Sequence, residues 1–364
     1  MENNLETEQY ETVIKAKRSE FSIFDSALAC VLFIAFNIMF VIFARITGLL
    51  NSGSSFVSFI LQALVEAVFA VAAFVVAKCR KTDLIVGAGM NKKVSWRIVA
   101  FCFLASLVSL LGFGNLTNVF LELLQYFGYS SILGSISINS FWQYLGYVIS
   151  SCAIAAFCEE LLFRGVIESG LKKWGIKVAV GFSALIFMLM HGNAEQTVHQ
   201  FIVGVIVGYV FYKTNNLWLG VLIHAFNNFI PITQAYFLSL IPTGETVTET
   251  VVAIGLGDIL IDLVIALALA AAGFYIISLL IKAIINENRC INGEEKTNDN
   301  LTSIKVDGDE QSVEMSIDGV EGYESVETIK PEDKKISGAT IAMFAISGLY
   351  LVGEWILYTI YGFI

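Results

Sequence analysis

Apolar runs long enough to cross a membrane recur along this chain of 364 residues and limit its fold more than any other feature. A run of about 20 apolar residues spans the hydrocarbon core of a bilayer as a helix, because a helix bonds every backbone polar group internally. Hydrophobic residues make up 56% of the sequence and charged residues 15%, which excludes an ordinary soluble domain. We therefore predict an all-α, polytopic helix bundle in the cell membrane.

The predicted spans number about nine, and they divide the chain into six parts. Their approximate bounds are 24–44, 56–77, 98 onward, 141–172, 176–191, 197–213, 217–231, 255–281 and 339–364, with fraying expected near Gly112 and an end at Pro231. The parts are a polar arm (1–20), the first three spans (21–140), a core of four spans (141–231), the region of the eighth span (232–285), an acidic linker (286–338) and a final span (339–364). The linker has few large apolar residues, and we predict that it is disordered.

The positive charges indicate how the bundle is oriented. All Lys and Arg residues except Arg45 and Arg164 fall in the N-terminal arm or in the loops after the second, fourth, sixth and eighth spans. By the positive-inside rule, this pattern predicts a cytoplasmic N-terminus and a cytoplasmic linker. The six cysteines form no CxxC pair, so we expect neither a disulfide framework nor a cysteine metal site. The sequence has no basic stripe or phosphate-binding loop, so no nucleic acid is expected as a partner, and it predicts no particular oligomeric state.

Polar and ionisable residues interrupt three of the apolar segments in the core. Such side chains are costly at membrane depth, which makes them candidates for function. At 1.5 Å per residue, Glu159 and His191 both stand ~20 Å above the turn at 172–177 if their spans form a hairpin. His224 and Asn228 are four residues apart on one face of their helix, ~12 and ~18 Å above its start. We therefore predict that these side chains meet at one depth, where His224 and Asn228 can donate hydrogen bonds to an oxyanion.

The two adjacent glutamates have different expected roles. Glu160 and Arg164 are spaced i and i+4 with the acid first, which favours a helical ion pair and relieves the cost of a buried arginine. Glu159 is turned about 100° away on the helix and is free to act with His191 as a general base on water. Taken alone, the Glu-Glu-x-x-x-Arg pattern is typical of an ordinary ion pair. His199 is interpreted as a hydrogen-bonded residue at the membrane interface.

Three short motifs carry the candidate residues in order along the chain: Glu159-Glu160-x-x-x-Arg164, Phe187-x-x-x-His191 and His224-x-x-x-Asn228. They resemble the motifs of the CAAX protease and bacteriocin-processing family, which includes the type II CAAX prenyl endopeptidases. The resemblance covers residues 141–231. It implies a helical intramembrane endopeptidase in which Glu159 and His191 activate water while His224 and Asn228 stabilise the oxyanion.

The substrate that the resemblance implies is a membrane-embedded or lipidated peptide or protein, reached within the lipid bilayer. Two other interpretations stay open: a non-proteolytic membrane scaffold, such as a bacteriocin-immunity or regulatory protein, and a proton-coupled transporter built on a carboxylate–histidine chain. We expect no cofactor. The alternative is a zinc ion held by Glu159, His191 and His224, because a carboxylate and two imidazoles form several catalytic zinc sites, and the family has also been classed as metalloproteases.

Overall fold

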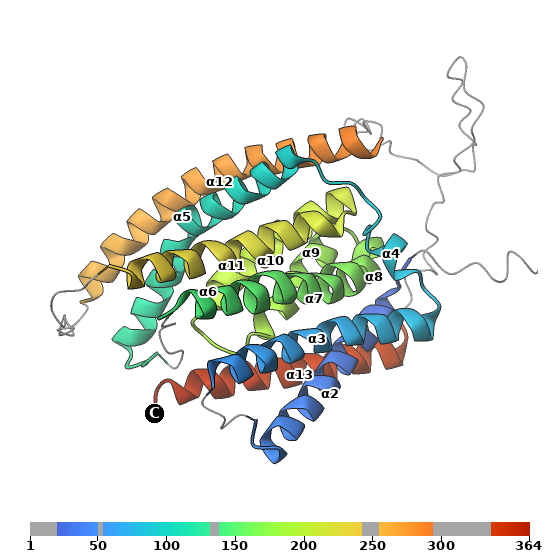
Figure 1. The fold of residues 1–364 in the computed structure, drawn as a ribbon, viewed down its shortest axis with the longest axis horizontal. Helices are drawn as coiled ribbons and strands as arrows, with labels where there is room; N and C mark the ends of the chain where they lie inside the picture. The colour runs from blue at the N-terminus through green and yellow to red at the C-terminus, as the bar shows by residue number, and fades with distance from the viewer. Residues whose placement is uncertain (1–19, 50–53, 132–137, 242–254, 294–335) are drawn as a thin grey trace, which may run out of the picture.

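Helices alone build the part of this protein that the computed structural model describes, namely residues 20–49, 54–131, 138–241, 255–293 and 336–364 (Figure 1). On one side of the bundle, two long helices pack side by side: α5 (Trp96–Tyr126) and α12 (Leu256–Asn292). On the other side lie α2 (Ile23–Ile46), α3 (Ser55–Arg80), the short α4 (Leu84–Gly87) and α13 (Gly338–Tyr361). Between these two groups lie the segment Phe141–Trp174, α9 (Ile176–Leu189), α10 (Thr197–Thr214) and α11 (Leu217–Ser239).

Six of these helices are long and apolar enough to cross a membrane: α2, α3, α5, the segment Phe141–Trp174, α12 and α13. The protein is therefore a multi-pass integral membrane protein, as predicted. The predicted spans at 176–191, 197–213 and 217–231 are also helical, but α9 has only 14 residues and the six helices do not include α10 or α11. The count of nine spans and the cytoplasmic N-terminus thus stay predictions.

The segment Phe141–Trp174 is the most enclosed of the six. Half of its most apolar stretch is buried, against a third or less for the other five. It is one continuous rod made of consecutive helical pieces: α6 (Phe141–Tyr147), η2 (Val148–Ile154), α7 (Ala155–Leu162), η3 (Phe163–Glu168), α8 (Ser169–Leu171) and η4 (Lys172–Trp174). Its central position explains why it can present polar side chains to several neighbouring helices at once.

Aromatic ring contacts pack the segment Phe141–Trp174 against its neighbouring helices. The Phe69 ring on α3 stacks on Phe33 of α2 at 4.3 Å between centroids, and it lies 6.0 Å from Phe163. Phe163 in turn meets the edge of Phe187 on α9 at 5.2 Å. The hydroxyl of Ser26 on α2 donates to the backbone carbonyl of Ile167 at 2.8 Å. These contacts fix α2, α3 and α9 against one stretch of the rod.

Three sequence-based boundaries were wrong. The third span does not fray near Gly112, because α5 runs unbroken from Trp96 to Tyr126. Gly112 faces Gly273 of α12 so closely that a Cβ atom at Gly112 would lie 2.9 Å from the Gly273 Cα atom. The missing side chains therefore permit close packing of two helices, as small residues do in membranes.

Pro231 does not end the seventh helix either, because α11 continues through it to Ser239. The residues after the proline are held by tertiary contacts: Ile232 is buried, and the ring of Tyr236 stacks on Tyr144 at 4.7 Å. Proline has no N–H group to donate to the carbonyl four residues earlier, which belongs to Asn227. The helix therefore continues, but the Asn227 carbonyl receives no hydrogen bond from the residue at position 231.

The predicted acidic linker begins later than expected, since α12 remains helical to Asn292. Asn292 accepts a hydrogen bond from the Lys93 amide at 2.8 Å, and Asn288 accepts one from Asn216 at 2.8 Å. These bonds attach the end of α12 to the loop before α5 and to the start of α11. Most of the linker, residues 294–335, and the N-terminal arm up to residue 19 lie outside the described residues.

Candidate active site

Glu159 and Glu160 of the first motif lie on α7, which is flanked by two π-helical turns, η2 and η3, and Arg164 lies on η3. A π-helical turn carries one residue more than an α-helical turn, and such insertions occur frequently at functional sites. The turns change the direction in which residues before and after α7 point. Nothing in the apolar sequence pattern distinguishes them from an ordinary α-helix, and the sequence analysis missed them.

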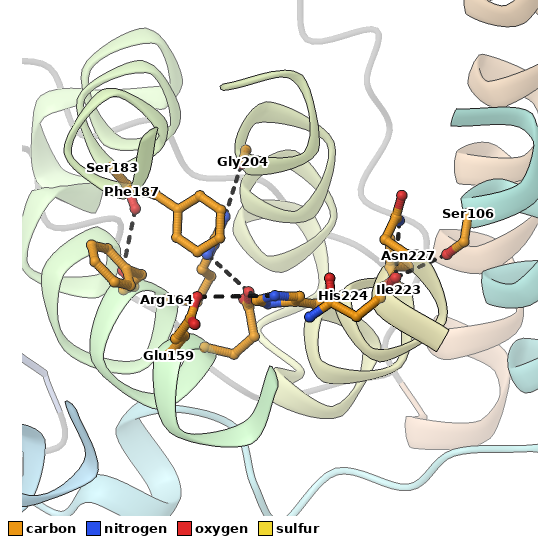
Figure 2. A network of polar contacts seen from close by, with 12 residues as sticks. Ser106, Glu159, Arg164, Ser183, Phe187, Gly204, Ile223, His224 and Asn227 are labelled. Atoms are coloured by element: carbon orange, nitrogen blue, oxygen red, sulfur yellow. Dashed lines mark hydrogen bonds and ion pairs between the residues drawn. The ribbon is translucent and has the colours of Figure 1, made fainter. Parts of the chain in front are cut away.

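The predicted ion pair between Glu160 and Arg164 is present and fully buried (Figure 2). The Arg164 guanidinium donates one hydrogen bond to Glu160 Oε1 at 2.9 Å and another to the Gly204 carbonyl on α10 at 3.0 Å. It also lies over the ring of Phe187, 4.7 Å from the centroid. A buried cation is thus paired, hydrogen-bonded and covered by an aromatic face, which offsets its desolvation.

Glu160 has a second partner that the sequence analysis did not assign. Its Oε1 atom lies 2.9 Å from Nδ1 of His224, so the imidazole donates to the carboxylate. This bond fixes the orientation of the ring and leaves Nε2 directed at Glu159, whose Oε2 atom is 3.9 Å away (Figure 2). A carboxylate that orients a histidine in this way also stabilises its doubly protonated form.

His191 is held by its own motif. Its Nδ1 atom donates to the Phe187 carbonyl at 2.8 Å, since a carbonyl oxygen only accepts, and Nε2 is left for another partner. The Phe187 ring lies 5.0 Å from the ring of His191 and 5.6 Å from that of His224, in edge-on geometry. The phenylalanine of the second motif is therefore a spacer that separates both histidines and covers Arg164.

The third motif is held from three sides. The side-chain amide of Asn228 donates to the Ser151 carbonyl on η2 at 2.8 Å, which leaves its second N–H free for another acceptor. Asn227 donates to the Ile223 carbonyl at 3.0 Å, and Ser106 of α5 donates to the same carbonyl at 2.9 Å (Figure 2). The residue just before His224 is thus tied to α5.

One cavity of about 530 Å³ unites the predicted catalytic residues. Its lining includes Glu159, His191, His224 and Asn228, which come from α7, the turn after α9, and α11. These side chains therefore line one cavity, as predicted, and their common depth in the membrane stays a prediction. His199 lines the same cavity, and its interpretation as a residue of the membrane interface stays a prediction.

The helices outside the core also contribute to this cavity. Asn37 of α2 and Gln62 and Glu66 of α3 line it. The sequence analysis assigned no role to Glu66, although a lone acid in an apolar run carries the same desolvation cost that drew attention to Glu159. The presence of a lone acid in the apolar run of α3 could therefore have identified Glu66 as a candidate site residue.

A second cavity of about 680 Å³ adjoins the first, and the two share Asn37, Met190 and His191. Its other walls come from α2 and α13, which contribute residues including Arg45 and Tyr358. A path lined by both helices thus leads to His191.

The same residues, Glu159, His191 and His224, were the predicted ligands of the zinc alternative. Within the ranges that the structure describes, no three His, Cys, Asp or Glu side chains lie together in positions that could hold a metal ion. His191 and His224 direct their Nδ1 atoms to the Phe187 carbonyl and to Glu160, respectively. The zinc alternative would therefore need the side chains of Glu159, His191 and His224 to move closer together.

The fold and the cavity define a class: a multi-pass membrane protein that gathers carboxyl and imidazole groups inside its helix bundle. Residues 140–230 match the family model described as Rce1-like, type II CAAX prenyl endopeptidase. The match confirms the resemblance seen in the three motifs and places the predicted site residues inside a segment typical of a membrane-protease family. No curated protein matches the chain. No solved structure matches it either.

Proposed function

We propose that this protein is an intramembrane endopeptidase that hydrolyses a peptide bond in a membrane-associated or lipidated peptide or protein. One observation carries the proposal: Glu159, His191, His224 and Asn228, which come from all three motifs, line a single cavity within the bundle. A non-proteolytic scaffold or immunity protein would not require this convergence, because buried acids and histidines cost stability wherever they are not used. Peptide maturation and bacteriocin self-immunity are both roles that such a peptidase can serve.

The proposed reaction begins with water between Glu159 and Nε2 of His191. Glu159 takes a proton from the water as its oxygen attacks the substrate carbonyl carbon. The oxyanion that forms accepts hydrogen bonds from the free N–H of Asn228 and from His224. For His224 to donate from Nε2, its ring must carry both protons, a state that Glu160 stabilises from 2.9 Å. The C–N bond then breaks as the amine nitrogen receives the proton.

The experiment that tests this function compares the membrane peptides of cells carrying the wild-type chain with those of cells carrying Glu159→Gln. We expect a defined set of uncut peptides or proteins to accumulate only in the mutant, because the variant keeps the cavity but lacks the base. Mass spectrometry of the membrane fraction identifies them and the bond that is cut. An identical peptide profile in both strains would contradict proteolysis and favour a scaffold.

We further propose that the reaction needs no metal ion. Within the described residues, Glu159, His191 and His224 do not lie together in positions that could hold a metal ion. Asn228, on the same helix face as His224, suits an oxyanion donor. Purified active protein is therefore expected to contain no stoichiometric zinc and to keep its rate after thorough chelation. Elemental analysis together with the assay measures this. Activity that is lost on chelation and restored by zinc would establish the alternative ligand set Glu159, His191 and His224.

A further inference from the structure

A third cavity lies on the other side of α10 from the candidate active site. It has a volume of about 520 Å³, and its walls are α5, α10 and α12, which pack against one another (Figure 1). Gln200 lines the catalytic cavity, whereas its neighbour Phe201 lines this one, and no described residue lines both. The lining residues Phe201, Tyr209 and Phe274 are exposed, so the cavity is a groove that opens on the outer surface of the bundle. We call it the α10–α12 groove.

One end of the α10–α12 groove is polar. Lys282 of α12 and Tyr209 of α10 line it there, and neither side chain has a hydrogen-bond or ion-pair partner within the described ranges. Asn216, two residues after the end of α10, donates to Asn288 of α12 at 2.8 Å, so these parts of the chain lie level. Counting back at 1.5 Å per residue, Lys282 lies ~9 Å from Asn288 and Tyr209 ~10 Å from Asn216. The ammonium group and the phenolic hydroxyl therefore stand at about one level of the groove.

The opposite end of the α10–α12 groove is aromatic. The backbones of Gly112 and Gly273 meet there, so the next residues, Phe113 and Phe274, lie at one level of α5 and α12. Phe201 lines the same end from α10, ~12 Å before the tyrosine of the polar end. The groove thus changes along its length from three phenylalanine rings to an ammonium group and a hydroxyl. This is the polarity of an acyl chain joined to a headgroup.

The α10–α12 groove also has the depth of one bilayer leaflet. The 19 residues between Asp262 and Lys282 carry no charge. As a helix they span ~28 Å, close to the ~30 Å thickness of a hydrocarbon core, so Lys282 lies where the headgroups begin. From there to Phe274 is ~12 Å along α12, within the ~15 Å of one leaflet. These dimensions fit an acyl chain that enters the groove from a headgroup beside Lys282.

We propose that the α10–α12 groove binds one anionic phospholipid of the surrounding bilayer. Its acyl chain lies against the three phenylalanines, and its phosphate accepts hydrogen bonds from Lys282 and Tyr209. A cation without a counter-ion at the membrane surface favours an anionic headgroup, and basic pockets between membrane helices are typical sites for such lipids. The lipid of a lipidated substrate fits less well, because α10 separates the groove from the catalytic cavity. The proposal is independent of the proposed function.

Native mass spectrometry of the purified protein in detergent tests the role of the charge. The probes are phosphatidylglycerol, which is anionic, and phosphatidylcholine, which is zwitterionic, both with oleoyl chains. We expect wild type to bind one phosphatidylglycerol more tightly than phosphatidylcholine, and Lys282→Gln to bind phosphatidylglycerol roughly fivefold more weakly, the effect of one lysine at a membrane surface. The matched control, Lys213→Gln, removes a lysine near the same end of α10 but outside the groove, so it should bind as wild type does. Equal affinities of wild type and Lys282→Gln, or the same loss in Lys213→Gln, would overturn the proposal.

A second variant tests the groove itself. Val205→Trp fills it from α10 without a change of charge, and we expect binding of both lipids to weaken at least about tenfold, the effect of excluding about two CH₂ groups from an apolar site. The melting temperature in lipid-free detergent checks that Lys282→Gln and Val205→Trp keep the fold. Unchanged lipid binding by Val205→Trp would contradict the proposal. If cells carrying that variant also accumulated the uncut proteins of Glu159→Gln, the groove would instead hold the lipid chain of a substrate.

Discussion

Purified Glu159→Ala protein is expected to fold normally and to have lost turnover of any substrate that the wild type cleaves. Glu159 is the predicted base, and Nε2 of His224 lies 3.9 Å from its Oε2 atom. A missing general base typically costs 10²- to 10⁴-fold in rate. The rate measured in detergent with a fluorogenic peptide, once a substrate is known, tests this loss.

The fold of Glu159→Ala should be as stable as that of the wild type, because the change breaks no ion pair with arginine. Thermal melting of the purified protein measures this. Glu122→Gln is the matched control: it also neutralises an acid within a membrane helix, α5, but lies outside the catalytic cavity. Glu159→Ala activity within tenfold of that control would show that another group is the base.

Glu160→Ala is expected to reduce both activity and stability. The change strands the guanidinium of Arg164, which is fully buried, and it removes the acceptor of His224 Nδ1. Removing one partner of a buried ion pair costs ~3–5 kcal/mol, because the remaining charge is left uncompensated. We therefore expect a clearly lower melting temperature than for Glu159→Ala, and a lower yield of folded protein from membranes.

A double variant separates the two effects of Glu160. In Glu160→Ala combined with Arg164→Leu, no charge is stranded, so the melting temperature should rise back towards that of wild type. Activity should stay lost, because His224 still lacks the carboxylate that orients its ring. If Glu159→Ala and Glu160→Ala melted at the same temperature, the division of labour between the two carboxylates would be wrong.

The ion pair and the convergence of the motif residues on one cavity were predictable because helical geometry is regular. The i, i+4 spacing of Glu160 and Arg164 predicted their ion pair. Counting 1.5 Å per residue predicted that Glu159 and His191 come together, and both line one cavity. Both inferences need only the rise and pitch of a single helix. The family resemblance added the expected roles but no geometry.

Contacts between distant helices were not predictable, because spacing along one helix says nothing about which face meets which neighbour. The bond between Glu160 and His224 depends on packing across the bundle, and so do the places of Glu66 and His199 in the cavity. Pro231 is a second case in which packing between helices decides the structure. A local rule predicted a helix end, and the stacking of Tyr236 on Tyr144 overrides it.

The second cavity, beside His191, has a consequence for how the protein is made. Its walls are α2, which precedes the motifs in the chain, and α13, which follows them. A ribosome synthesises the chain from the N-terminus, so the motif residues reach the membrane before Tyr350 and Tyr358 exist. A nascent chain can therefore assemble its catalytic residues while the cavity beside His191 lacks the wall that α13 supplies. The site acquires that wall only when translation of the last helix is finished.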